Sequence, residues 1–88
     1  MSANPFVPTQ VTSQEKSLAE LRRGQSGHIT RIDQPELEIA LLKMGVTVGD
    51  SIALTGAAPM RGPVAVRVGH IKLSLRREDA SHIWISQR

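Results

Sequence analysis

The sequence contains no cysteine, no tyrosine and only two aromatic residues, Phe6 and Trp84. The missing thiols exclude disulfide bonds, cysteine-based zinc sites, iron–sulfur clusters and a cysteine nucleophile. Two rings are too few to stack the bases of a single-stranded nucleic acid or to line a groove for proline-rich peptides. We therefore do not expect a nucleic-acid partner.

Long apolar runs are absent as well. No stretch approaches the roughly 20 apolar residues that cross a bilayer, and residues 1–14 lack the basic start and apolar centre of a secretory signal. We expect a cytoplasmic protein without direct membrane insertion. Its 88 residues suffice for one domain, and a domain of this size leaves little room for an enclosed catalytic pocket.

The chain divides into a short tail and one domain. Residues 1–14 carry Pro5 and Pro8 among polar residues and show no periodic apolar face, which is typical of a disordered segment. Every periodic stretch lies further along the chain. We therefore predict a single domain over residues 15–88.

The clearest strand signal runs from Val64 to Leu75. Apolar residues occupy even positions in its first half and odd positions in its second half. A two-residue hairpin turn at Gly69-His70 explains this change of phase, because it places all six apolar side chains on one face. Glycine at the first turn position favours type II′. In this register Arg67 lies directly opposite Lys72 on the outer face.

One helix is predicted over 36–44, ended by Gly45. Apolar residues recur there at helical spacing: Leu37, Ala40, Leu41 and Met44. Asp33 and Glu36 have the spacing of a capping box, and Pro35 between them suits a first helical turn.

The apolar stripe of this helix is expected to pack on the rest of the domain. Ile39 and Leu42 lie beside the stripe and widen the apolar surface. In the alternative interpretation, these two residues meet a partner or a second copy of the chain.

Shorter elements complete the pattern. Helical turns are predicted at 17–21, capped by Ser13 or Ser17, and at 77–81. Strands are predicted at 27–32, with a bulge near Arg31, and at 51–55 and 83–85. About five short strands favour a mainly β fold that curls to protect its edges. We predict a small, partly open β-barrel with an inserted α-helix and short helical turns.

Motifs for catalysis and metal binding are missing. No serine lies in a G-x-S-x-G sequence, and the glycine-flanked segment 56–63 lacks the Lys-Ser or Lys-Thr of a phosphate-binding loop. His28, His70 and His82 lie on separate predicted elements without the spacing of metal ligands. We expect no enzyme activity, no cofactor and no metal site.

Charge leaves one candidate binding surface. Eleven Lys and Arg residues against eight Asp and Glu residues give a formal charge of +3. Four basic residues lie in or beside the hairpin: Arg61, Arg67, Lys72 and Arg76. A solvated strand face is the plain interpretation, but like charges opposite each other cost stability, which a partner's carboxylate would offset. These four are therefore the candidate partner-binding residues.

Four stretches form a further pattern: LAEL (18–21) with Gly24 and GHI (27–29); LLKMG (41–45) with Val48-Gly49; Ala58-Pro59 through GPVAV (62–66); and LSLRREDA (73–80). In this order and spacing, the chain from about residue 17 to residue 86 resembles the FeoA family, the small cytosolic component of bacterial ferrous iron uptake. It departs from the family at Arg61-Gly62, where Gly-Asp or Gly-Gly is frequent, and this changes the local charge.

The resemblance implies an SH3-like barrel with an inserted helix and no catalytic residues. It also implies a partner, the membrane ferrous iron transporter FeoB with its cytosolic G-protein domain. FeoA-like proteins are thought to bind and regulate that transporter, so the resemblance implies recruitment of the chain to the inner face of the membrane.

Two alternatives remain open. The same domain type occurs at the C-terminus of DtxR-like metal-dependent repressors, so the chain would be a free-standing regulatory relative of that domain. No helix-turn-helix precedes the predicted barrel, which argues against direct DNA reading. In the second alternative, His28, His70 or His82 converge with carboxylates to bind ferrous iron directly.

Overall fold

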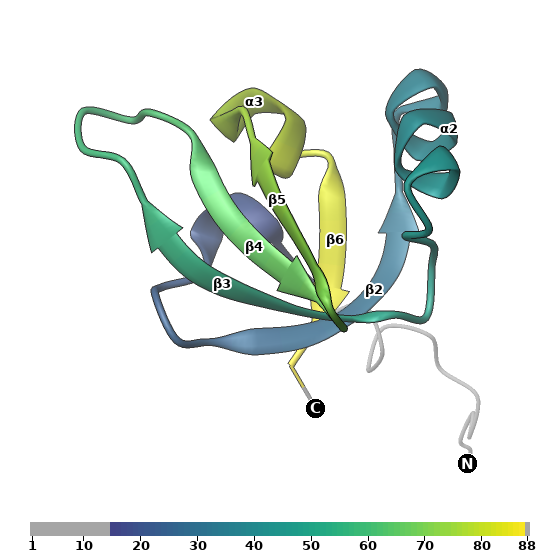
Figure 1. The fold of residues 1–88 in the computed structure, drawn as a ribbon, viewed down its shortest axis with the longest axis horizontal. Helices are drawn as coiled ribbons and strands as arrows, with labels where there is room; N and C mark the ends of the chain where they lie inside the picture. Colours follow the sequence, from purple (N-terminus) through teal and green to yellow (C-terminus); the bar gives the residue numbers. More distant parts are fainter. Residues whose placement is uncertain (1–14, 88) are drawn as a thin grey trace, which may run out of the picture.

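The computed structural model describes residues 15–87, and its strands form a single antiparallel sheet (Figure 1). The strands are β1 (Glu15–Ser17), β2 (Ser26–Ile32), β3 (Ser51–Ala57), β4 (Val64–Val68), β5 (Ile71–Leu75) and β6 (Ile83–Ser86). Their order is β1-β6-β2-β3-β4-β5, so β1 and β5 lie at the two edges and the barrel is partly open. The predicted mainly β architecture is confirmed.

The sheet has one strand more than the roughly five that the sequence predicts. The additional strand is β1, which pairs with β6 from Glu15↔Ser86 to Ser17↔Trp84. Three residues are too few to show an alternating pattern, so only the pairing with β6 reveals the strand. The predicted tail at 1–14 lies outside the described residues.

The β4–β5 hairpin has the predicted register. Val68 faces Ile71, Arg67 faces Lys72 and Val64 faces Leu75. Gly69 has a φ of +61°, whereas the φ of His70 is not positive, as a type II′ turn requires. The bulge predicted near Arg31 is also present, because the β2–β6 register shifts between Ile29 and Arg31.

The core lies inside the curled sheet and is closed by two short helical elements. These are the 3₁₀ helix η1 (Leu18–Glu20) and α3 (Arg77–Ala80). The largest fully buried side chains are Leu18, Ile29, Leu41, Ile52, Ile83, Ile85, Val46, Val64 and Val66. Ser17 caps η1 by accepting a 3.0 Å hydrogen bond from the backbone N–H of Ala19, so one of the two predicted caps is confirmed.

Helix α2 (Pro35–Lys43) stands at the side of the barrel beyond the end of β2 (Figure 1). Its predicted apolar stripe packs only in part: Leu41 is buried and Leu37 half-buried, but Ala40 and Met44 are exposed. The helix therefore meets the barrel along a narrow line. Gly45, with a φ of +89°, ends it as predicted.

The predicted capping box is wrong. The N-cap of α2 is Gln34, and no side chain caps the helix, although Pro35 does occupy its first turn. The Asp33 carboxylate bonds instead to His82 and Trp84. None of the helices in residues 15–87 is long and apolar enough to cross a membrane.

Candidate functional site

Two of the four predicted partner-binding residues lie side by side on the outer face of the hairpin. Arg67 on β4 and Lys72 on β5 are directly paired in the register, and both are exposed. Neither forms an ion pair with any residue in the range 15–87. This face therefore carries two adjacent positive charges that the described part of the chain does not neutralise.

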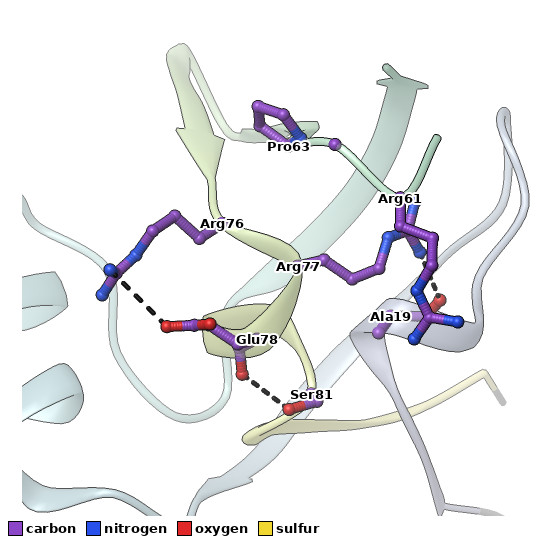
Figure 2. Close-up of a pocket in the computed structure, with 8 residues that line it drawn as sticks. Ala19, Arg61, Pro63, Arg76, Arg77, Glu78 and Ser81 are labelled. Carbon is purple, nitrogen blue, oxygen red and sulfur yellow. Dashed lines mark hydrogen bonds and ion pairs between the residues drawn. The ribbon is translucent and has the colours of Figure 1, made fainter. Parts of the chain in front are cut away.

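The other two, Arg61 and Arg76, lie at the opposite end of the hairpin and line a hollow. Arg61 belongs to the loop between β3 and β4, and Arg76 directly precedes α3. The hollow has a volume of about 620 Å³ and is open to solvent. Its lining is Ala19, Arg61, Gly62, Pro63, Arg76, Arg77, Glu78 and Ser81 (Figure 2). The four predicted residues thus form two separate basic sites.

Arg76 is already engaged within the chain. Its Nη1 lies 3.5 Å from the Glu78 carboxylate, and its Nε lies 3.2 Å from the Asp79 carboxylate. The hydrogen bond to Asp79 raises the pKa of Arg76, and the negative charges of Asp79 and Glu78 raise it further. Figure 2 shows Arg76 extending to one side of the hollow toward Glu78. Arg76 is therefore a weaker candidate for contact with a partner than the other three residues.

Arg77 also lines the hollow, although it was not among the predicted partner-binding residues. Its Nη1 donates a long hydrogen bond of 3.4 Å to the backbone oxygen of Ala19. Its Nε is buried and has no hydrogen-bond partner among the described residues. One signal could have found it. In the predicted helical turn, Arg77 lies three positions before the apolar Ala80, and this spacing puts the two on one face. The structure shows that face to be the inward one, because Ala80 is fully buried.

A second polar cluster lies where β2 meets β6. The Asp33 carboxylate accepts a hydrogen bond from Trp84 Nε1 at 2.9 Å and lies 2.7 Å from His82 Nδ1. Arg31 stacks over the Trp84 ring, with its guanidinium carbon 4.6 Å from the ring centroid. The hydrogen bond from Trp84 lowers the pKa of Asp33, and His82 and Arg31 add to this effect. The cluster ties two strands together across the surface.

The histidines considered as iron ligands lie apart. His28 is on β2, His70 is in the hairpin turn and His82 is bonded to Asp33. Across residues 15–87, no group of three or more His, Asp or Glu side chains is arranged to hold a metal ion. The structure therefore does not bring together the ligand set of the iron-binding alternative.

Helix α2 and the turn after it present an apolar surface. Ile39 and Leu42, the two residues beside the predicted stripe, are 55% and 59% exposed, and Met44 and Val48 add to the surface. The interpretation of this surface as a contact for a partner or a second copy stays a prediction.

Comparisons with known proteins agree with this architecture. Residues 16–87 match the model of the FeoA domain family. The chain is 37% identical over 69 residues to an Fe(2+) transport protein A/Fe(2+) transporter FeoB fusion protein of Porphyromonas gingivalis. This match covers 77% of the chain but only 8% of the fusion protein.

Solved structures with a similar fold include FeoA proteins. A crystal structure of an iron uptake regulatory protein (FeoA) has a TM-score of 0.70 and 25% identity, over 82% of this chain and 94% of that one. A FeoA-like protein from Clostridium acetobutylicum has a TM-score of 0.74 and 25% identity, over 84% and 87%. A manganese-dependent transcriptional repressor has a TM-score of 0.75 at 18% identity, over 84% and 42%. The last likeness shows the fold alone, and the barrel is SH3-like as predicted.

Proposed function

Because this chain belongs to the FeoA domain family, we propose that it is an accessory protein of ferrous iron uptake that binds and modulates the transporter FeoB. The observation that carries the proposal is the relative in which an Fe(2+) transport protein A is fused to FeoB in one polypeptide. Fusion keeps two domains at a high effective concentration. Regulation by contact also needs a surface of this domain that meets the partner.

The outer face of the hairpin supplies such a surface. Arg67 and Lys72 are exposed and face each other in the register, an arrangement that is unfavourable in the free protein. An acidic surface on the partner would offset the repulsion between Arg67 and Lys72. Binding would then be favoured both by the new ion pairs and by the loss of this repulsion. In this proposal the chain acts by contact and supplies no catalytic group. The contact would also bring it to the inner face of the membrane.

Calorimetric titration into the soluble cytosolic G-protein domain of FeoB tests the proposal. It should be run with GDP and with a non-hydrolysable GTP analogue. Binding that differs between the two nucleotides would identify the state that the chain favours. Absence of binding to both forms would contradict the proposal for this domain of the transporter.

A matched pair of variants tests the surface. The double variant R67S/K72S should weaken binding strongly, while R22S/R23S removes the same charge from an exposed turn elsewhere and should leave binding nearly unchanged. Equal losses in the two variants would mean that only net charge matters. In that case the hairpin face is not the docking surface.

The alternative of a regulatory relative of DtxR-like repressors has less support. The similarity to the manganese-dependent repressor is one of fold, and the chain spans 42% of that protein. By contrast, the family model covers residues 16–87.

A further inference from the structure

We propose that the hollow between the β3–β4 loop and α3 is a binding site for a carboxylate side chain of a protein partner, held by Arg61 and Arg77. The inference deepens the proposed function, because it names a second contact and its chemistry. It does not depend on the hairpin face of Arg67 and Lys72, which lies at the other end of the hairpin.

The charges that line the hollow favour an anionic ligand. Arg61 and Arg77 line the same hollow, and neither forms an ion pair with an acidic residue among residues 15–87. The remaining positions, 1–14 and 88, contain no Asp or Glu. No ion pair within residues 15–87 therefore neutralises these two guanidinium groups, although the Glu78 carboxylate lines the same hollow and is paired with Arg76.

Arg77 has hydrogen-bonding capacity that the described structure does not use. Its guanidinium donates one long hydrogen bond of 3.4 Å to the Ala19 oxygen, and its Nε is buried without a partner in the described structure. A guanidinium has five donors in a planar fork that fits a carboxylate, so one long hydrogen bond leaves most of that capacity free. Burial of Nε restricts this side chain, and a restricted side chain loses less conformational entropy when it binds.

The loop that carries Arg61 has an unfavourable backbone conformation. Met60 and Arg61 both have a φ of +60°, a left-handed conformation that is unfavourable for residues other than glycine. The loop is closed by hydrogen bonds from Ala58 N to the Pro63 oxygen at 2.9 Å and from Gly62 N to the Pro59 oxygen at 3.2 Å. Strained backbone of this kind concentrates at ligand sites. Here it places Arg61 on the hollow (Figure 2).

The lining favours a carboxylate on a polypeptide over a free dianion such as phosphate. Glu78 lines the same hollow, and its negative charge opposes a doubly charged ligand more than a singly charged one. The hollow is open, and Ala19 and Pro63 supply apolar contacts beside the arginines. These features suit an Asp or Glu side chain with its neighbouring residues.

The test is an NMR titration of the ¹⁵N-labelled chain alone. The probe is a capped peptide with two adjacent glutamates, the control peptide has glutamines in their place, and a third arm uses inorganic phosphate. We expect saturable shifts at the Arg77 Nε–H and at the Gly62 and Ser81 amides with the glutamate peptide, and none with the glutamine peptide. Tighter binding of phosphate than of the glutamate peptide, or no saturable shift in the hollow, would overturn the proposal.

Variants then locate the site. R61S should weaken glutamate-peptide binding about tenfold, the effect of a hydrogen bond to a charged group. R77K keeps the positive charge but loses the planar set of guanidinium donors. It should therefore weaken peptide binding, while its NMR spectrum remains that of a folded protein. R67S/K72S removes two charges outside the hollow and should leave the affinity within about twofold at physiological salt. A loss in R67S/K72S as large as in R61S would overturn the assignment.

The transporter is absent from this titration. Failure here would therefore remove the carboxylate site without contradicting docking on FeoB. Failure of the calorimetric titration would remove that docking without contradicting the carboxylate site.

Discussion

Trp84 donates its indole Nε1–H to the Asp33 carboxylate across 2.9 Å, joining β6 to the end of β2. His82 approaches the second oxygen of the same carboxylate at 2.7 Å. Asp33 is thus the point at which the chain entering α2 is tied to the last strand. Trp84 is the only tryptophan, so its fluorescence reports directly on this link.

The link predicts a loss of stability in acid. Trp84, followed by His82, lowers the pKa of Asp33 from its ordinary value of 3.8. A carboxyl group whose pKa is lower in the folded protein stabilises the fold above the unfolded pKa, and this contribution disappears as the pH falls through the folded pKa. Unfolding by urea, followed through Trp84 fluorescence, should show a steeper loss below about pH 4 in the native chain than in D33N. Parallel pH profiles would show that Asp33 contributes nothing.

Replacing Gly27 with alanine should strongly lower the free energy of unfolding. A Cβ at this position would lie 2.6 Å from the backbone oxygen of Ser86, on the neighbouring strand β6. Backbone of a paired strand cannot move aside easily, so G27A should destabilise the fold by about 1–3 kcal/mol. G56A is the matched control, because Gly56 lies in a strand and nothing is within 4 Å of its Cβ. Equal stability of the two variants in urea titration would contradict the prediction.

Local patterns predicted most of the sheet. The phase change at Gly69-His70 was sufficient to predict the register of the hairpin, because period-two alternation and turn chemistry are both local properties. The capping box failed for the opposite reason. Asp33 has partners at His82 and Trp84, 49 and 51 positions along the chain, and no local pattern signals them.

In the candidate site, too, local features were predictable from the sequence and long-range contacts were not. The opposition of Arg67 and Lys72 follows from the hairpin register and was predicted. The hollow depends on the meeting of η1, the β3–β4 loop and α3, three segments that are distant in sequence. The sequence therefore does not predict Arg77 as a lining residue, and the ion pairs of Arg76 with Glu78 and Asp79 weaken its predicted role in partner binding.

Glycine substitutions at Met60 and Arg61 should have the same effect on stability but different effects on binding of the glutamate peptide. Met60 is 93% exposed and has a φ of +60°, so M60G should relieve backbone strain and raise the free energy of unfolding by about 0.5–1 kcal/mol. R61G relieves the same strain and should be similarly stable. Only R61G should lose affinity for the glutamate peptide, since M60G keeps the guanidinium. A destabilised M60G would mean that the loop is not strained.

Reversing one charge of the Arg67–Lys72 pair should separate stability from partner binding on the hairpin face. R67E places opposite charges at directly paired positions of β4 and β5, and this change should stabilise the free protein by about 0.2–1 kcal/mol. The same change places a negative charge against the acidic surface proposed for the partner, so binding to the transporter's cytosolic domain should be lost. Urea unfolding and calorimetric titration measure the two effects. In the control R67E/K72E two negative charges face each other, so the repulsion returns. This variant should lose the added stability and still fail to bind. If R67E binds as well as the native chain, the face makes no contact with an acidic partner, and the repulsion between Arg67 and Lys72 is only a cost to the fold.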